Sequence, residues 1–203
     1  MSTPTLEWRQ VNTWRLAQHG LQPRLTRGPL TEAVTRTGGL QSQVASAAEL
    51  ALGMRVEGIT AETVRAALWQ ERTLVKTWAM RATLHLLPAA DLPLYTAALG
   101  AHQTLNWPAY FEAFGISPAH SEAFLAAVPQ VLGDEPQTRE QLAQAVAEFI
   151  GAPEIAKNLN SSSWGSLWKP SAWRGDLCFG PNQGQHPTSV PPSAWFGAWQ
   201  PLE

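Results

Sequence analysis

Apolar residues recur at helical spacing along most of the chain, and glycine, proline and capping residues separate the runs. In the N-terminal part this pattern predicts helices over residues 6–19, 30–37, 44–56 and 61–70. The next two segments, 73–80 and 83–87, are rich in Leu, Val, Thr and Trp and indicate short strands separated by Arg81 and Ala82. Pro88 ends the second strand, because proline cannot donate to the ladder of a sheet. We therefore expect a series of helices followed by a β-hairpin.

The same order occurs again in the C-terminal part. Helical patterns cover residues 89–100, 107–114, 118–132, 138–150 and 153–158. Thr138 and Gln141 form a capping-box signature at the start of the fourth of these helices. Residues 175–180 and 188–190 indicate strands around a turn at 181–184. Helices followed by a hairpin is the element order of a winged helix. The sequence thus predicts a mainly helical α+β fold of two tandem winged-helix units, residues 1–100 and 101–203.

A short polar stretch, Gly38-Gly39-Leu40-Gln41-Ser42-Gln43, separates two of the predicted helices. The two glycines end the first helix and turn the chain. Gln41 and Gln43 fall two apart in extended backbone, so we expect both amides to point to one side. A primary amide offers one acceptor and two donors but takes up no proton, so the pair can orient a water or a base edge without acting as a strong general base. Spacing alone leaves open that both glutamines are solvated surface.

The composition is that of an ordinary globular protein. With 203 residues, of which 44% are hydrophobic, the chain can form one domain or two small ones around a core. Charged residues interrupt every apolar run before it reaches the length of a membrane span, and Glu7 and Arg9 are atypical of a signal peptide. The single cysteine, Cys178, excludes an internal disulfide, and the histidines lack metal-binding spacing. We expect a cytoplasmic protein that needs neither a metal nor a membrane.

The formal net charge of −2 hides an asymmetry. Residues 1–81 contain 10 Lys+Arg against 6 Asp+Glu, whereas residues 82–203 contain 4 against 10. The basic part is the candidate surface for a polyanion, and most of its cations are arginines, which suit bidentate phosphate contacts. Arg81, at the predicted hairpin tip, is placed to reach a phosphate or a narrow minor groove. Because the excess is modest, a solvated helical surface remains the alternative.

Three longer phrases resemble one protein family. Residues 39–44, 74–86 and 169–181 are similar to the tandem winged-helix DNA glycosylases of the AlkZ and YcaQ type. The resemblance implies hydrolysis of the N-glycosidic bond of bulky N7- or N3-alkylated purines, including those in interstrand crosslinks. It also implies double-stranded DNA as the partner, a nucleoid-associated location, and a monofunctional reaction that uses no cofactor. The family's catalytic Gln-x-Gln motif corresponds to Gln41 and Gln43.

The chemistry implied by the resemblance is compatible with neutral amides. Alkylation at purine N7 or N3 leaves a positive charge on the base, so the base departs without a general acid while the sugar passes through an oxocarbenium-like state. Two carboxamides can place the attacking water and stabilise positive charge through their carbonyl oxygens. Because position 43 carries no carboxylate, we expect activity only on lesions that are already charged.

The candidate DNA-binding residues are Lys76, Arg81, His85, Lys169 and Arg174. For His85, a hydrogen-bonded structural role is the alternative to DNA contact. For Lys169 and Arg174, which precede the second hairpin, phosphate contact and plain solvation are both open.

Two further alternatives concern the tryptophans and the function as a whole. Trp164 and Trp168 share a helix face, where core packing competes with base stacking. As for function, the rivals to the glycosylase interpretation are a non-catalytic winged-helix DNA-binding module and a remnant of a longer glycosylase.

Overall fold

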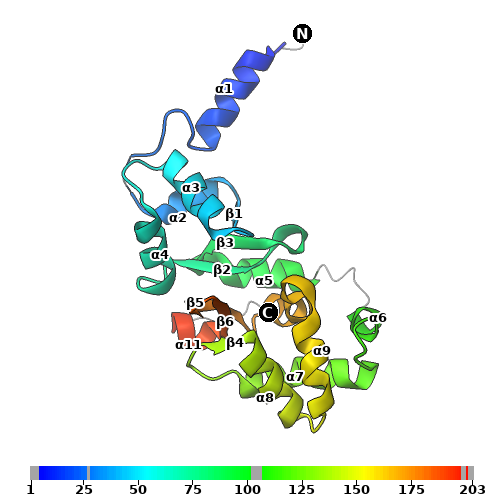
Figure 1. Ribbon diagram of the computed structural model, residues 1–203. Helices are drawn as coiled ribbons and strands as arrows, with labels where there is room; N and C mark the ends of the chain where they lie inside the picture. Colours follow the sequence, from blue (N-terminus) through cyan, green and yellow to red (C-terminus); the bar gives the residue numbers. More distant parts are fainter. Residues whose placement is uncertain (1–4, 27, 102–106, 198–199, 201–203) are drawn as a thin grey trace.

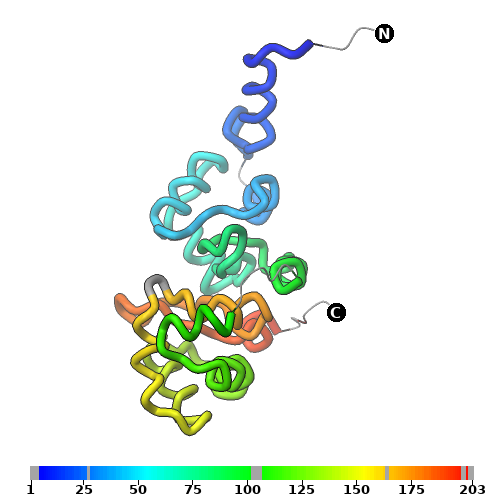
Figure 2. Tube along the Cα trace, turned by 90° about the vertical axis from the view of Figure 1, so that its right-hand side faces the viewer, coloured from blue at the N-terminus to red at the C-terminus, as the bar shows by residue number. Residues whose placement is uncertain are grey.

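Short helices surround two small antiparallel sheets in the computed structural model, which describes residues 5–26, 28–101, 107–197 and 200 (Figure 1). Residues up to 101 form a first half and residues from 107 a second half, and the two halves lie one below the other in two perpendicular views (Figures 1 and 2). The predicted mainly helical α+β fold class is confirmed.

The first half contains the predicted helices and hairpin. Its elements are α1 (Trp8–Gln18), α2 (Leu30–Arg36), β1 (Leu40–Gln41), α3 (Ala45–Arg55), α4 (Ala61–Trp69), β2 (Leu74–Trp78), the 3-10 turn η1 (Met80–Ala82), β3 (Leu84–Pro88), the 3-10 turn η2 (Ala89–Asp91) and α5 (Leu92–Ala101). The strands pair in the order β1-β3-β2, so the glutamine stretch supplies an edge strand. Thr60 caps α4 by accepting the backbone N–H of Thr63 at 3.2 Å.

Helices α2, α3 and α4 cover one face of this sheet. Leu40, Leu74 and Leu86 project from the three strands into a core that also contains Val34 and Leu52, all of them buried. Alternate residues of a strand point to opposite faces, so this packing fixes which side of β1 faces the helices.

The second half repeats the strand order with different helices. Its elements are α6 (Trp107–Glu112), α7 (Pro118–Val131), β4 (Gln137–Thr138), α8 (Arg139–Phe149), the 3-10 turn η3 (Pro153–Ile155), α9 (Ala156–Ser161), the 3-10 turn η4 (Ser163–Trp168), α10 (Lys169–Trp173), β5 (Cys178–Gln183), β6 (His186–Val190) and α11 (Pro192–Phe196). The order β4-β6-β5 again places the last strand in the middle. The predicted capping box of Thr138 and Gln141 is present at the start of α8. The boundary between two winged-helix units at residue 100 stays a prediction.

The second hairpin differs from the predicted one in its turn. The sequence predicts the turn at residues 181–184, whereas β5 continues to Gln183 and β6 begins at His186, so the turn lies at Gly184 and Gln185. Pro181 is accommodated because the pairing register shifts between Gly180 and Gln183. An irregularity of this kind lets a strand tolerate a proline that cannot donate to the ladder.

The two halves share part of their cores. Trp78 and Leu84, from the hairpin of the first half, are buried in the apolar cluster of the second half. Trp173 of α10 donates its indole N–H to the backbone carbonyl of Trp78 at 3.1 Å, and both side chains are buried. Phe179 of β5 packs on Trp78 with ring centroids 4.7 Å apart. Contacts between β2 and β5 therefore hold the two sheets against each other.

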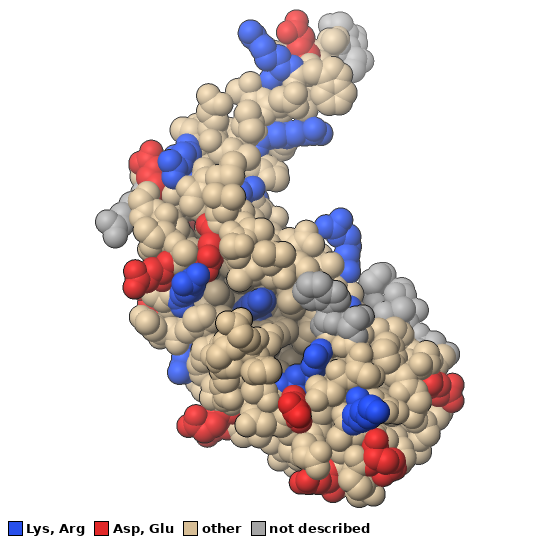
Figure 3. All heavy atoms as spheres, viewed as in Figure 1, with Lys and Arg blue, Asp and Glu red and all other residues tan. Residues whose placement is uncertain are grey.

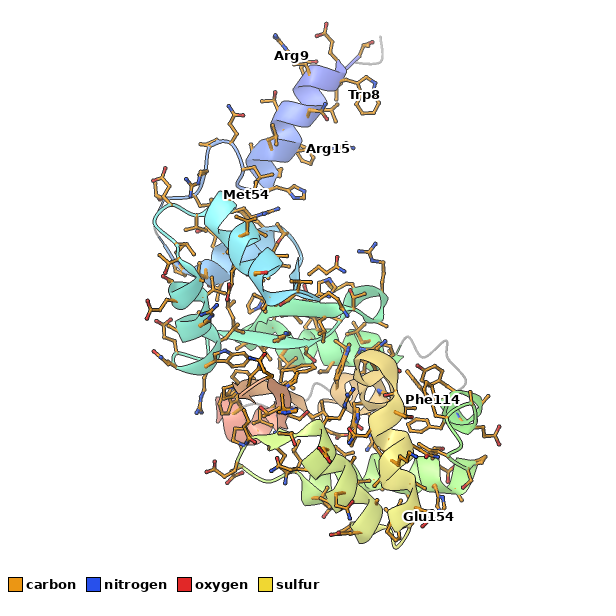
Figure 4. All side chains as sticks on the ribbon, in the orientation of Figure 1. Trp8, Arg9, Arg15, Met54, Phe114 and Glu154 are labelled. Atoms are coloured by element: carbon orange, nitrogen blue, oxygen red, sulfur yellow. The ribbon has the colours of Figure 1, made fainter. Side chains whose placement is uncertain are left out.

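The helix α1 projects away from the remainder of the chain (Figures 1 and 2). None of its residues is buried, and Trp8 and Trp14 remain 75% and 62% exposed. Trp8, Arg9 and Arg15 point outward from it in Figure 4. The sequence therefore predicted the helix but not its isolation, because helical periodicity indicates an apolar face without saying what covers it.

Of the two tryptophans considered for stacking, Trp168 is buried and packs against Phe124 with ring centroids 5.0 Å apart, which favours a core role. The Trp164 side chain lies outside the described part of the structure. Within the described residues, no helix is both long enough and apolar enough to cross a membrane.

Candidate functional site

The glycine pair after α2 determines how the glutamine stretch enters the sheet. Gly38 and Gly39 have φ angles of +65° and +98°, a region that side-chain-bearing residues rarely adopt. A Cβ atom at Gly39 would lie 2.8 Å from the Leu87 Cδ2 atom and 3.0 Å from the Met80 Cε atom. Only glycine allows the chain to turn this closely over the hairpin, and Leu40 then pairs with Leu86 of β3.

Hydrogen bonds to Leu84 fix the residues that follow. The Ser42 N–H donates to the Leu84 carbonyl at 2.7 Å, and the Gln43 Oε1 atom accepts the Leu84 N–H at 3.2 Å. Ser42 is buried and Gln43 is half-buried. Because the backbone N–H needs an acceptor, this contact orients the Gln43 amide, leaving one lone pair of its oxygen and its two N–H donors for other partners.

Gln43 lines a cleft of about 760 Å³ between the two halves. The first half contributes Lys76, Trp78 and Leu84 to its walls, and the second half contributes Arg139, Lys157 and Phe179 among others. In Figure 3 the surface is hollowed between the halves, and Lys and Arg side chains border the hollow. The arrangement combines an oriented amide, an aromatic wall and positive charge, and this volume is within the range of small-molecule binding sites.

Gln41 is placed differently from Gln43. It ends β1 opposite His85, its side chain is exposed, and it is not among the residues that line the cleft. The prediction that both amides point to one side assumes extended strand through residue 43. The strand ends at Gln41, so alternation does not determine the direction of the Gln43 side chain. The structure brings Gln43 into the cleft and leaves Gln41 at the exposed edge of the same sheet.

The hairpin of the first half carries two of the predicted DNA-binding cations. Lys76 lies on β2, is half-buried and lines the cleft, and burial lowers the pKa of its amine. Arg81 is exposed at the hairpin tip, and both Arg81 and the half-buried Ala82 have positive φ angles, 55° and 57°. The tip is thus a tight turn that presents the Arg81 guanidinium to solvent, where a polyanion can reach it.

His85 is buried, with 4% of its surface exposed, and its Nδ1 atom lies 2.9 Å from the Thr83 carbonyl oxygen. A buried imidazole held by a backbone carbonyl supports the hydrogen-bonded structural role over contact with DNA.

Lys169 and Arg174 lie apart from the cleft lining, at the two ends of α10. Burial lowers the pKa of the half-buried Lys169 amine. Arg174 is exposed and pairs with Asp176 at 3.2 Å. Burial raises the pKa of Asp176, and the Arg174 charge opposes that rise. The structure therefore does not bring these two cations together with Gln43.

The sequence interpretation missed the residues that the second half adds to the cleft. Arg139 opens α8 and donates to the Ser162 carbonyl at 3.2 Å, and Lys157 is exposed on α9. Both lie in the acidic part of the sequence, where charge balance gave no reason to select them. Both residues are far from Gln43 in the sequence, so no local sequence pattern indicates that they lie in the same cleft. Among the described residues, no group of three or more His, Cys, Asp or Glu side chains could hold a metal ion.

Comparisons with known proteins relate the chain to one family of DNA glycosylases. A family model described as "DNA glycosylase AlkZ-like" matches residues 34–202. The "Interstrand DNA cross-link repair glycosylase" of Streptomyces sahachiroi is 37% identical over 196 residues, which cover 94% of this chain and 51% of that protein. The solved structure of "Streptomyces sahachiroi DNA glycosylase AlkZ" is similar with a TM-score of 0.83 and 33% identity, over 98% of this chain and 53% of that chain. The chain spans about half the length of these relatives.

Proposed function

The chain belongs to the DNA glycosylase AlkZ-like family, and from that membership we propose that it hydrolyses the N-glycosidic bond of bulky N7- or N3-alkylated purines in double-stranded DNA. Purines held in interstrand crosslinks are included, as the name of the 37% identical relative suggests. The observation that carries the proposal is the position of Gln43, whose oriented amide lines a cleft bordered by Lys76, Arg139 and Lys157.

The repeated strand order supports the further proposal that each half is a winged-helix unit. In both sheets a short strand precedes a hairpin and pairs with its second strand. The hairpin tip with Arg81 then contacts the DNA backbone, and Arg139 and Lys157 contact phosphates from the opposite wall of the cleft. These contacts position the duplex without reading its sequence.

In the proposed reaction the protein supplies orientation rather than proton transfer. The alkylated base is already cationic and leaves without protonation. The remaining lone pair of the Gln43 oxygen holds the attacking water and faces the positive charge that develops on the sugar. Gln41, exposed at the edge of the same sheet, is the second amide of the family's motif. A neutral amide cannot drive release of an uncharged purine, so unmodified DNA is not a substrate.

The test is a single-turnover assay on a duplex with one N7-alkylguanine, in which alkaline treatment converts base loss into strand breaks. We expect base release by the wild type and a loss on the order of 10²-fold for Gln41→Ala and Gln43→Ala, the effect of removing one stabilising hydrogen-bonding group. Gln130→Ala is the matched control, because Gln130 is an exposed glutamine on α7 outside the cleft lining.

Binding measured on the same duplex separates the two candidate functions. If all four proteins bind DNA and none releases the base, the proposed glycosylase function is wrong and the protein is a non-catalytic DNA-binding module. Equal base release by all four would show that the two glutamines take no part in the reaction.

A further inference from the structure

Lys76 is placed in the cleft in an unusual way. Its side chain is half-buried on β2, and its Nζ atom lies 5.5 Å from the centre of the Phe179 ring. Within the described part of the chain, no carboxylate forms an ion pair with it. An amine whose neighbour is an aromatic face, rather than a carboxylate, keeps its nitrogen available for other chemistry.

Lys76 and Gln43 approach the cleft from opposite edges of one sheet. Lys76 pairs with Leu86 of the central strand, and Leu86 pairs in turn with Leu40 of β1. The backbones of the two edge strands are therefore two strand spacings, about 10 Å, apart. Gln43, two residues after β1, and Lys76 both line the cleft, so the oriented amide and the lysine amine face the same space.

The environment also favours the reactive form of the amine. Burial lowers the pKa of Lys76, so a larger fraction of the amine is neutral at a given pH than for a solvated lysine. Only the neutral amine is a nucleophile, and lysines in partly apolar sites are the ones that form Schiff bases with carbonyl groups.

We propose that Lys76 is a nucleophile that forms a Schiff base with the aldehyde of an abasic site in DNA and cleaves the strand there by β-elimination. The inference rests on the proposed glycosylase function for the origin of the abasic site, and it adds a second reaction to the one that the family resemblance implies.

The reaction balances without an oxidant, a reductant or a metal. The Lys76 Nζ atom attacks C1′ of the open-chain sugar, and loss of water gives a protonated imine, whose positive charge faces the Phe179 ring. Water removes a proton from C2′, and the C3′–O3′ bond breaks, with its electron pair leaving on the phosphate of the downstream strand. A second water hydrolyses the imine, which returns the amine and leaves an unsaturated aldehyde on the upstream strand.

The chain contains only three lysines. Lys76 is half-buried and lines the cleft, and each of the other two has only one of these features. Lys157 lines the same cleft but is exposed. Lys169 is half-buried, and burial lowers its pKa, but it does not line the cleft. Substitution of each by arginine keeps the positive charge, and with it any phosphate contact, while removing the nucleophilic amine.

The experiment uses a preformed abasic duplex, made by excising uracil from a labelled oligonucleotide, so that base release by this protein is not required. Borohydride reduces an imine to a stable amine, and the cross-linked species is then detected on a denaturing gel. We expect a trapped adduct with the wild type and with Lys169→Arg, and loss of the adduct to background with Lys76→Arg. Peptide mapping should place the adduct on Lys76. Without borohydride, strand cleavage should follow the same pattern.

Three results would overturn the proposal. They are absence of an adduct with the wild type, an undiminished adduct with Lys76→Arg, and mapping of the adduct to another amine. Circular dichroism and DNA binding of Lys76→Arg establish that the variant is folded. Base release from alkylated DNA is measured in a separate assay. If no adduct forms on the abasic duplex, the proposed glycosylase function still stands. If no base is released from alkylated DNA, the adduct on the preformed abasic duplex still tests the role of Lys76.

Discussion

Replacement of Gly39 by alanine should destabilise the protein through two separate effects. The φ angle of +98° is strained for any residue with a side chain, at a cost of about 1–3 kcal/mol. The added methyl group would also lie 2.8 Å from the Leu87 Cδ2 atom and 3.0 Å from the Met80 Cε atom. Met80 is half-buried and flexible, but Leu87 is fully buried, so the core has to shift. Overpacking of this kind costs about 1–3 kcal/mol more.

Gly38→Ala is the matched control for this prediction. Gly38 also has a positive φ, +65°, but a Cβ atom there would meet no atom within 4 Å. Both substitutions lose glycine's conformational freedom, but the φ of Gly38 lies in the left-handed helical region and that of Gly39 lies beyond it, so the difference reports the packing together with the extra backbone strain at Gly39. We expect Gly39→Ala to be less stable than Gly38→Ala by about 1–3 kcal/mol, which for a chain of this size corresponds to roughly 2–12 °C in Tm.

The assay is thermal and urea unfolding of both variants, followed by far-ultraviolet circular dichroism, with base release measured on the folded proteins. Gly39→Ala should also lose base release, because the turn sets the position from which Gln43 reaches the Leu84 N–H. Equal stability of the two variants, or a Gly39→Ala protein as stable as the wild type, would refute the argument that the turn is packed against the hairpin.

The remaining predictions concern the second half. Gly180→Ala would place a Cβ atom 2.8 Å from the hydroxyl of the buried Thr188, and we expect a loss of about 1–3 kcal/mol in urea unfolding. Trp173→Phe removes the donor to the Trp78 carbonyl, and leaving a buried acceptor unpaired should cost about 1–3 kcal/mol, measured as a lower Tm. Cys178 is fully buried and burial strongly raises its thiol pKa, so the folded protein should not react with a thiol reagent at mildly alkaline pH, while the unfolded protein should react once per chain. Rapid reaction of the native protein would contradict this.

Local patterns were sufficient to predict most of the elements. The Thr60 cap and the Thr138–Gln141 capping box depend on residues three apart, and both are present. The second hairpin turn was misplaced because Pro181 is a strong local signal, whereas the register shift that accommodates it depends on the partner strand.

The candidate site was only partly predictable. The motif that carries the family resemblance includes Gln43, and the structure places Gln43 in the cleft. The opposite wall, with Arg139 and Phe179, is brought there by the packing of β5 on β2, a long-range contact without a sequence signal. Leu40 is buried and Gln41 exposed, as alternation along β1 indicates, but which of the two faces becomes the cleft depends on the packing of the second half.

The burial of Trp78 within the core of the other half limits how this protein can be divided or recombined. Cutting the chain between the halves would expose the Trp78 and Leu84 side chains and remove the partner of the Trp173 indole. A chimaera that exchanges one half with that of a relative must therefore carry a hairpin matched to the new α10, and calorimetry of the intact chain should record one melting transition for both sheets.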